Sequence, residues 1–378
     1  MLTVERILFA AEHIVLAYFL VLNSTYLAFT IVSFYDLRRY RQRVWRGDLR
    51  ALLSDSSYLP VSILVPAHNE RGTVIANVQS LLTSTYPEFE VVVINDGSTD
   101  DTIDCLKRAF ALVEVPPATR VSIETKPVLA VFRSLEHPNL IVIDKENGGK
   151  SDALNAGINV STYPLFCSID ADSLLESDAL LRVARSFAED DRIIASGGIV
   201  RVLNGSLVAH GEVIEARAPG TPMLLCQSLE YVRGFLAGRT ALAKMNCLLI
   251  ISGAFGLFRK GPVLAVGGYR TDTVCEDMEL VVRLHRETRR LKQHGRVVFV
   301  PDPVCWTQIP ADWRSLLRQR DRWQRGLLES LWMHRRMFLN PRYGAVGLIG
   351  FPFYVLFEAL GPLIETAGYL LLPILWLT

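Results

Sequence analysis

Two aspartates separated by a single residue, Asp170 and Asp172, are the first candidates for chemistry in this 378-residue chain. They follow the apolar run 163–169, which is typical of a buried strand. Alternate side chains of an extended segment point the same way, so both carboxylates would face one divalent cation. Mg²⁺ suits such a pair, because it takes one or two carboxylates together with substrate phosphates. On its own the D-x-D pattern is more often a solvated turn, so its meaning depends on the rest of the chain.

A second acidic pair, Glu276 and Asp277, stands in segment 271–286, whose apolar residues recur at helical spacing. Acidic residues at a helix start interact favourably with the helix dipole, and this structural role alone would explain both. The alternative is a general base in a cleft, a role that carboxylates fill in many enzymes. The segment by itself leaves both interpretations open.

Two turn-rich segments, 95–102 and 145–150, place polar groups next to predicted helix starts. Asp96 ends an apolar run, and Lys150 follows two glycines at the start of a helix-like segment. Backbone N–H groups at such a start, with a cation nearby, can hold phosphate oxygens. The spacing is not that of a P-loop, and no G-x-G-x-x-G follows the first predicted strand, so a Rossmann dinucleotide site is not expected.

The elements that must position these residues follow an alternating α/β pattern. Strands are predicted at 61–69, 90–98, 139–149 and 163–173, and helices at 71–85, 150–161 and 314–336. Each predicted strand ends in a polar cluster. Ligands of open α/β sheets bind outside the carboxyl ends of the strands, so these clusters are expected to converge on one crevice. Residues 113–138 hold four prolines and no clear periodicity, and we expect a surface insertion there.

Composition narrows the class of protein. The formal net charge is +1, which gives no overall attraction to nucleic acid, and half of the residues are hydrophobic. The six cysteines form no C-x-x-C pair and lack the spacing of a zinc site, so we interpret them as packing residues that a cytoplasmic domain keeps reduced.

The hydrophobic surplus is concentrated at the two ends of the chain. Residues 14–35 carry no charge over 22 positions, enough for a spanning helix of ~20 residues. A cleaved signal peptide is the rival interpretation, but the run exceeds the ~7–15 residues of a signal core and no A-x-A-like site follows. The arginines after it predict that its C-terminal side is cytoplasmic: Arg38, Arg39, Arg41, Arg43, Arg46 and Arg50.

The C-terminal apolar region, 343–378, is interrupted by Glu358, Gly361-Pro362 and Glu365. It is either one broken helix or two segments with a turn at Gly361-Pro362. The chain ends inside apolar sequence, so we expect a longer natural protein.

Seven motifs between Val61 and Gly326 form an ordered set. In sequence order they are "VPAHNE", "NDGSTD", "NGGKSDALNAG", "DADS", "SGAFGLFRK", "CEDMEL" and "QRDRW". The set resembles the family 2 glycosyltransferases, and within them the membrane-embedded processive synthases of cellulose, chitin, hyaluronan and poly-N-acetylglucosamine. The resemblance implies a GT-A-like α/β fold with a mostly parallel central sheet and flanking transmembrane helices.

This resemblance implies five regions along the chain. They are an N-terminal transmembrane anchor (1–36), a basic juxtamembrane linker (37–58), a cytoplasmic glycosyltransferase domain (59–310), amphipathic interfacial helices with the Q-x-x-R-W motif (311–342), and a truncated C-terminal transmembrane region (343–378).

The resemblance also implies roles for single residues on the donor side. Asp96 would hold the uracil or ribose of a UDP-sugar, and Lys150 would approach the diphosphate. Asp170 and Asp172 would bind the sugar nucleotide and Mg²⁺ or Mn²⁺. The nucleotide pocket would be lined by Pro66, His68, Asn69 and Glu70.

On the acceptor side, Asp277 would take the proton from the acceptor hydroxyl, with Glu276 beside it. Gln319, Arg322 and Trp323 would border the acceptor and the leaving diphosphate. The other arginines of this segment are expected to reach toward lipid headgroups: Arg318, Arg320 and Arg325.

Three positions depart from the pattern of the family. Asn95 stands where many relatives have an aspartate, His68 where tyrosine is common, and Cys275 where threonine is common. The catalytic set is intact, but the identity of the donor sugar stays open.

The function implied is inverting, metal-dependent transfer from a UDP-sugar to a growing glycan. Processive β-polysaccharide synthesis coupled to translocation is favoured, with a layout closest to the poly-N-acetylglucosamine synthases. The expected partners are a UDP-sugar, a glycan acceptor, the lipid bilayer and accessory membrane subunits, with no nucleic acid. The expected location is multi-pass in the inner or plasma membrane. The alternatives are a single-transfer enzyme acting on a lipid or protein, and a nucleotide-binding scaffold without catalysis.

Overall fold

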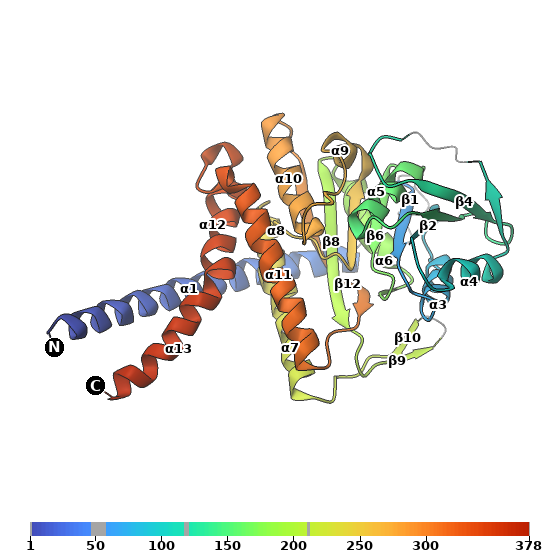
Figure 1. The fold of residues 1–378 in the computed structure, drawn as a ribbon. Coiled ribbons are helices and arrows are strands. Elements are labelled where there is room, and N and C mark those ends of the chain that lie inside the picture. Colours follow the sequence, from blue (N-terminus) through green and yellow to red (C-terminus); the bar gives the residue numbers. More distant parts are fainter. Residues whose placement is uncertain (1, 47–57, 117–120, 210–211, 378) are drawn as a thin grey trace.

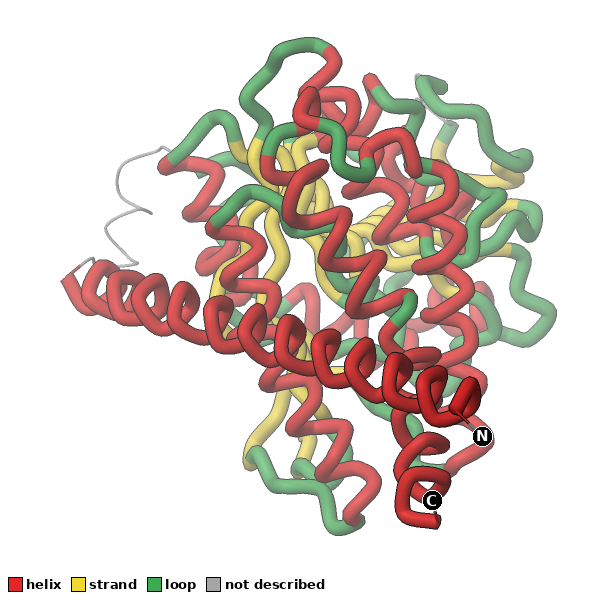
Figure 2. Tube along the Cα trace, turned by 90° about the vertical axis from the view of Figure 1, so that its left-hand side faces the viewer, coloured by secondary structure: helices red, strands yellow, loops and turns green. Residues whose placement is uncertain are grey.

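A computed structural model describes residues 2–46, 58–116, 121–209 and 212–377 of the chain. A large mixed sheet forms the body of the molecule, and two long helices project from one side of it (Figure 1). Both ends of the chain lie at the tips of these projecting helices, on the same side (Figures 1 and 2).

The sheet has ten strands in the order β3-β4-β5-β2-β1-β6-β11-β8-β12-β7. Their bounds are β1 Val61–Ala67, β2 Phe89–Asp96, β3 Leu112–Val115, β4 Val128–Ser134, β5 Leu140–Lys145, β6 Leu165–Ile169, β7 Leu174–Leu175, β8 Ile193–Val202, β11 Phe255–Arg259 and β12 Arg296–Thr307. The four central strands β5, β2, β1 and β6 are parallel, whereas β11 is antiparallel to both of its neighbours.

Helices cover the sheet and bury its central strands on both faces. They are α3 Val74–Leu82, α4 Thr102–Ala109, α5 Lys150–Val160, α6 Ala179–Glu189, α9 Lys260–Ala265 and α10 Glu276–Arg290. Helix α5 packs on β1 and β2, and α6 packs on β8 and β12. The central strands are therefore continuous apolar runs, as parallel strands covered on both faces require.

The predicted strands and helices of the donor half are present, with ends displaced by a few residues. The expectation of a surface insertion at 113–138 was wrong, because this segment contains β4 and most of β3. Strand β4 pairs antiparallel with β5, and β3 pairs antiparallel with β4, so the two strands extend the sheet at its edge. Its prolines, which suggested a loop, lie beside the strands and not within them: Pro116, Pro127 and Pro138. The expectation for the cysteines also fails at Cys226, which is exposed.

A helical layer lies between the sheet and the projecting helices (Figure 1). It consists of α7 Pro222–Arg233, the π-helix η1 Gly234–Arg239, α8 Thr240–Lys244, α11 Trp313–Met333, the 3₁₀ turns η2 Arg335–Met337 and η3 Pro341–Tyr343, the π-helix η4 Val346–Gly350, α12 Phe351–Phe353 and the π-helix η5 Tyr354–Ala359. A two-stranded hairpin, β9 Leu207–Ala209 with β10 Glu212–Glu215, stands apart from the main sheet.

The projecting helices are α1 Leu2–Arg46 and α13 Gly361–Leu377. Within the described residues, one helical stretch, Leu8–Gln42, is long and apolar enough to cross a membrane. A second candidate is the pair Val346–Ala359 and Gly361–Leu371, which bends by 41° at the break. The bend lies where Gly361-Pro362 was expected to interrupt the region.

Helix α1 continues without interruption into the segment expected to be a linker. It ends at Arg46, so Arg38, Arg39 and Arg41 are helical, whereas Arg50 and the rest of 47–57 lie outside the described residues.

The C-terminal half of α1 is attached to the body of the molecule by three polar side chains. Ser33 donates to the carbonyl of Ala237 in η1 at 2.6 Å, and Asp36 pairs with Lys244 of α8 at 2.7 Å. Tyr40 donates to the carboxylate of Asp302 in β12. These spacings of three and four residues put the three side chains on one face of the helix.

Candidate active site

The carboxyl ends of β1, β2, β5 and β6 bring the donor-side residues to one edge of the sheet, as predicted. His68 and Asn69 follow β1 directly and are exposed. Asn69 adopts a left-handed backbone with φ 58°, and its side-chain oxygen accepts from the backbone N–H of Thr99 at 2.8 Å. Its amide thus holds the turn after β2, a role that asparagine fills well because it tolerates this conformation.

The remaining two residues of the expected nucleotide pocket lie beside these. Pro66 is half-buried within β1. Glu70 accepts a hydrogen bond from the hydroxyl of Thr73 at 2.6 Å, and its backbone N–H donates to Thr102. Ring nitrogen Nδ1 of His68 lies 2.9 Å from the carbonyl oxygen of Asp96. The four residues thus lie in or just after β1, next to the end of β2.

Asp96 is more deeply buried than its expected role in nucleotide binding requires. Its Oδ1 lies 2.7 Å from Nζ of Lys145 and accepts from the N–H of Gly148 at 3.0 Å, and its Oδ2 accepts from Gly149 at 2.8 Å. Both carboxylate oxygens are therefore bonded within the protein. In this structure Asp96 shapes the glycine turn that leads to Lys150.

Lys145 is a residue that the sequence analysis missed. Its side chain is completely buried, and Nζ also lies 2.6 Å from Oδ1 of Asp152 on α5. It therefore joins the ends of β2 and β5 to the start of α5. The sequence signal that could have identified it is a lysine at the end of an apolar strand. A lysine buried at such a position needs anionic partners, because an unpaired buried charge is costly.

Lys150 lies where three functional elements meet. Its Nζ is 2.6 Å from Oδ1 of Asp170, which follows β6, and 3.2 Å from Oε1 of Glu276 at the start of α10. Burial alone would lower the pKa of Lys150, but the charges of Asp170 and Glu276 outweigh this effect and raise it. The lysine is therefore a permanent cation.

Asp277 lies in the same cluster and accepts two backbone hydrogen bonds. Oδ2 accepts from the N–H of Gly253 at 3.0 Å and Oδ1 from that of Met278 at 2.8 Å. A Cβ on Gly253 would come within 3.1 Å of Nζ of Lys150, so a glycine lets this N–H reach the carboxylate. Burial, followed by the charge of Glu276, raises the pKa of Asp277 to about 6.

The Asp170–Asp172 segment is a turn and not the extended segment that was assumed. The N–H of Ser173 donates to the carbonyl of Asp170 at 3.0 Å, and the amide of Asn77 donates to the carbonyl of Ala171 at 2.6 Å. Strand alternation therefore does not orient the two carboxylates.

The side chains around this turn offer part of the ligand set that a divalent cation needs. Among the residues that the structure describes, no group of three or more His, Cys, Asp or Glu side chains forms a ready-made metal site. Asp170 and Asp172 supply two carboxylates at an accessible edge. This set fits Mg²⁺ or Mn²⁺ bound jointly with the phosphates of a substrate, because Mg²⁺ rarely uses an all-protein cage.

Helix α11 carries the Q-x-x-R-W motif next to the loop before α10. Cys275 precedes Asp277 by two residues, and its Sγ lies 4.0 Å from the carbonyl oxygen of Arg322. Gln319 Oε1 is buried and has no hydrogen-bond partner among the described residues. Burial raises the pKa of Cys275 to about 12, so its thiol stays neutral and serves in packing.

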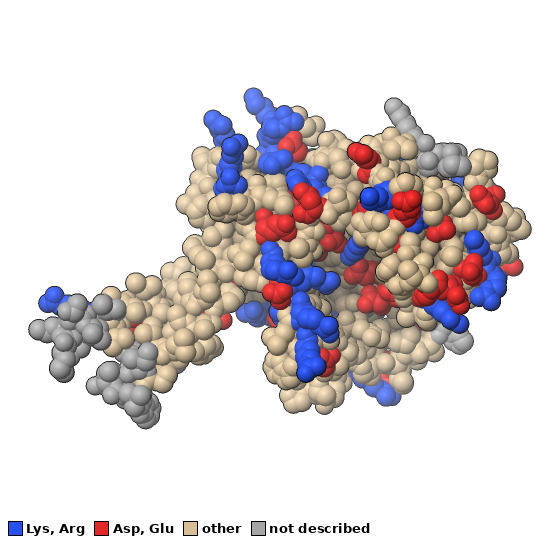
Figure 3. Space-filling view, in the orientation of Figure 1, with Lys and Arg blue, Asp and Glu red and all other residues tan. Residues whose placement is uncertain are grey.

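The arginines of α11 differ in their surroundings. Basic side chains form a row along the helix in the space-filling view (Figure 3). Arg320, expected to reach lipid, instead binds both carboxylate oxygens of Glu230 on α7 at 2.6 and 2.7 Å. Its guanidinium also lies 4.7 Å from the ring centre of Trp323 and covers one face of the indole. Arg318 and Arg325 contact neighbours on their own helix, Ser315 and Asp321 respectively.

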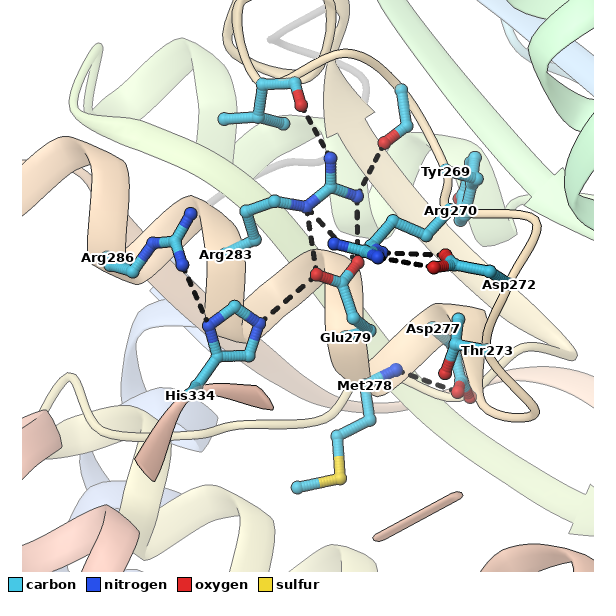
Figure 4. A network of polar contacts seen from close by, with 12 residues as sticks. Tyr269, Arg270, Asp272, Thr273, Asp277, Met278, Glu279, Arg283, Arg286 and His334 are labelled. Carbon is cyan, nitrogen blue, oxygen red and sulfur yellow. Dashed lines mark hydrogen bonds and ion pairs between the residues drawn. The ribbon is translucent and has the colours of Figure 1, made fainter. Parts of the chain in front are cut away.

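A buried polar network fixes α10 next to its start, where Glu276 and Asp277 lie (Figure 4). The carboxylate of Glu279 binds Arg283 at 2.8 Å and Nε2 of His334 at 3.1 Å. The guanidinium of Arg283 also donates to the carbonyls of Val266 and Gly268. The start of α10, which carries Asp277, is thereby held against the segment after α11.

Comparison with known proteins identifies the class of protein. The model of "Glycosyl transferase family 2" matches residues 62–213, and that of "Glycosyl transferase family group 2" matches residues 165–378. The chain belongs to the family 2 glycosyltransferases, which confirms the resemblance drawn from the seven motifs.

The relatives are polysaccharide synthases. The chain is 26% identical over 297 residues to a poly-beta-1,6-N-acetyl-D-glucosamine synthase of Staphylococcus aureus (strain MSSA476), an alignment covering 78% of this chain and 60% of the relative. A synthase of the same name from Staphylococcus epidermidis is 27% identical over 277 residues, covering 72% of this chain and 56% of the relative. The chain thus spans about 60% of the length of the curated relatives it matches.

A solved structure supports the GT-A-like fold. A mannosyltransferase from Pyrobaculum calidifontis, in complex with GDP-Man and Mn²⁺, superposes with a TM-score of 0.58 at 19% identity and covers 97% of this chain and 92% of its own. The predicted fold class is therefore confirmed.

Proposed function

We propose that this chain transfers a sugar from a UDP-sugar to a hydroxyl of a growing glycan, with inversion at the anomeric carbon. The observation that carries the proposal is the cluster of Lys150, Asp170, Glu276 and Asp277, contributed by α5, the turn after β6 and α10. The names of the staphylococcal relatives support N-acetylglucosamine as the sugar and repeated addition as the mode.

Asp277 acts as the general base in this proposal. A base is most effective when its pKa lies near the working pH, and burial brings the pKa of Asp277 to about 6. Its carboxylate takes the proton as the acceptor oxygen attacks the anomeric carbon and the bond to the diphosphate breaks. The attack comes from the face opposite the leaving group and needs no protein nucleophile, so an α-linked donor gives a β-linked product.

Charge on the leaving diphosphate is stabilised from the sheet edge. Lys150 supplies a fixed cation there, and preorganised charges of this kind contribute strongly to catalysis. Asp170 and Asp172 would hold Mg²⁺ or Mn²⁺, which when bound neutralises charge on the phosphates.

The acceptor binds along α11 in this proposal. The buried Oε1 of Gln319 has no partner among the described residues and would accept from a glycan hydroxyl that displaces the side chains covering it, and Trp323 offers its indole to a sugar ring. Arg322 is exposed next to the loop before α10 and would contact the leaving diphosphate.

We further propose that α1 and the bent pair ending in α13 cross or enter the inner or plasma membrane, with the catalytic domain in the cytoplasm. The basic residues at the C-terminal end of α1 support this orientation. We keep the five predicted regions and their roles as part of this proposal: 1–36, 37–58, 59–310, 311–342 and 343–378. We also propose that accessory membrane subunits bind the protein.

The test is UDP release from a panel of UDP-sugars by the protein in nanodiscs with Mg²⁺. We expect the fastest release with UDP-N-acetylglucosamine, a high-mass glycan as product, and loss of activity after chelation that added Mg²⁺ or Mn²⁺ restores. Products limited to one added sugar would overturn processivity and favour a single-transfer enzyme. Tight UDP binding without turnover of any donor would overturn the enzyme assignment and favour a scaffold.

A further inference from the structure

Gly326 lies in the interior of α11, where the helix meets the loop that leads to Asp277. A Cβ built on Gly326 would stand 2.2 Å from Sγ of Cys275, 2.5 Å from its Cβ and 3.1 Å from its backbone nitrogen. The two separations from the Cys275 side chain are too short for real atoms, and the third, to the backbone of the loop, is tight. Helix α11 therefore reaches this loop only because position 326 lacks a side chain.

Helix stability does not explain this glycine. Glycine inside a helix is unfavourable relative to alanine, because it loses more backbone freedom on folding. Gly326 is buried, and the helix continues on both sides of it. The close approach to Cys275 is the structural reason for a glycine here.

Two further contacts, from Glu329 of α11 and from His334 just after it, also hold the loop before α10 and the start of α10 close to α11. Oε2 of Glu329 accepts from the N–H of Val274 at 3.0 Å and lies 3.2 Å from the hydroxyl of Thr273. His334, just after the helix, bonds to Glu279 one turn into α10. The loop before α10 and its first turns are thus held against α11 on either side of Asp277.

We propose that Gly326 is a positioning residue that sets the separation between the base Asp277 and the acceptor-binding residues of α11. Gln319, Arg322 and Trp323 precede Gly326 by two turns or less, so their distance from Asp277 follows from how closely the helix approaches Cys275. The inference rests on the proposed function and deepens it, because it assigns a determinant of acceptor geometry.

Apart from the exposed Arg322, the residues proposed to bind the donor lie on elements other than α11. Lys150 and Asp170 belong to α5 and to the turn after β6, and Asp96 is fixed by Lys145. Displacing α11 by one methyl group should therefore leave donor binding intact and disturb the approach of the acceptor. This separation distinguishes a positioning role from a general loss of structure.

The experiment compares Gly326→Ala, Cys275→Gly and the double variant, each as the whole chain in nanodiscs. For Gly326→Ala we expect UDP affinity like that of the wild type, a raised KM for an oligosaccharide primer, and glycan elongation lower by about 10²-fold, the effect of misplacing reacting groups by ~1 Å. Hydrolysis of the UDP-sugar by water should persist. The double variant should recover elongation, because Cys275→Gly removes both the Sγ and the Cβ that the new methyl group meets.

The matched control is Gly261→Ala in α9. A Cβ on Gly261 meets no atom within 4 Å, so this variant makes the same chemical change in a helix without the contact. It should elongate glycan like the wild type.

Wild-type KM and elongation in Gly326→Ala would overturn the inference, and so would a defect that Cys275→Gly does not rescue. Thermal unfolding of the four proteins gives a readout independent of activity, in which Cys275→Gly should relieve the destabilisation caused by Gly326→Ala. If the wild type turned over no UDP-sugar while this coupling persisted, the proposed function would fail and the close contact would stand.

Discussion

At the scale of single residues, two lysines five positions apart have different tasks. Lys145 is fully buried between Asp96 and Asp152, so its charge is committed to the fold. Lys150 is half-exposed between Asp170 and Glu276, where a substrate phosphate could replace one carboxylate. The buried Lys145 holds the turn that leads to Lys150. The ammonium group of Lys150 is therefore positioned before any substrate binds.

The raised pKa of Asp277 predicts an acid limit to activity. A base must be ionised, so kcat/KM for the acceptor should fall as the pH drops below about 6, the pKa of this carboxyl. The folded protein binds this proton more tightly than the unfolded chain does, so the same ionisation reduces stability as the pH rises through 6. Asp277→Asn should lower kcat by ~10²–10⁴-fold and remove this acid limb.

The measurement is a pH–rate profile with saturating donor. An acid limb near pH 4 would show an ordinary carboxyl group and contradict the desolvated environment of Asp277. Glu176→Gln, a carboxylate that bonds to Trp306 outside the catalytic cluster, is the control and should keep the wild-type profile.

Loss of the buried cation should unfold the donor edge of the sheet. Lys145→Met leaves Asp96 and Asp152 buried without their partner, and breaking such a pair costs about 3–5 kcal/mol. Chemical unfolding and UDP binding measure the effect, and both should decline together. Lys126→Met removes an exposed lysine as the control and should leave both unchanged, whereas equal stability of the two variants would contradict the structural role of Lys145.

At the scale of elements, the sequence was informative where a signal is local. Central strands read as continuous apolar runs because both faces are covered, and their polar ends meet at one edge of the sheet, as predicted. The edge strands β3 and β4 were missed because an edge strand is only partly buried, and nearby prolines resembled loop signals. The turn at Asp170–Asp172 was misjudged because strand alternation was extended past the last paired residue, Ile169.

The missed residues share one property, which is a partner far away in sequence. Lys145 bonds to Asp96 across 49 positions, and Arg320 bonds to Glu230 across 90. No periodicity or spacing encodes such a pair, because it exists only after the sheet and the helical layer have assembled. The candidate site residues could be named from the sequence because each of them lies in a short local motif.

The contact between α11 and α7 predicts that Arg320 matters, against the expectation of a lipid-facing side chain. Its ion pair with Glu230 is partly exposed, so Arg320→Ala should change stability by less than about 1 kcal/mol. The variant frees the covered face of Trp323, and we expect a several-fold change in KM for the glycan primer with donor affinity unchanged.

Primer kinetics and thermal unfolding together test this prediction. Arg318→Ala, an exposed arginine that contacts Ser315 on its own helix, is the matched control. Equal primer kinetics in Arg320→Ala and Arg318→Ala would contradict the prediction and show that Arg320 does not affect primer binding. Glu230→Ala should reproduce only the change in stability, because it removes the other half of the ion pair but leaves Arg320 beside Trp323.

At the scale of the whole molecule, α1 has two parts. Its N-terminal half projects from the protein, and its C-terminal half packs against the sheet and the helical layer. Ser33, Asp36 and Tyr40 attach it to η1, α8 and β12, three elements of different origin in the sequence. Phe29 of α1 is buried and packs against Phe353, next to the bent pair of helices. The sequence predicted the apolar run but not this attachment, which depends on polar side chains at its end and just after it.

Weakening the attachment should destabilise the body of the protein. Tyr40→Phe removes the hydrogen bond to Asp302, and such a loss costs about 0.5–1.5 kcal/mol, or more if the carboxylate stays unpaired. Thermal unfolding in detergent measures the effect. The exposed Tyr35→Phe on the same helix is the control, and the attachment would be shown unimportant if both variants unfolded alike.

The length of α1 has a consequence for how the enzyme faces its surroundings. Its 45 residues extend over roughly 68 Å at 1.5 Å per residue, whereas a bilayer core is only ~30 Å thick. About half of the helix therefore lies outside any hydrocarbon layer that it crosses. The C-terminal half is the one attached to the sheet and the helical layer, through Ser33, Asp36 and Tyr40. If the N-terminal half of α1 crosses the bilayer, as proposed, its tilt sets the orientation of the attached site, and the product would leave in a fixed direction relative to the bilayer.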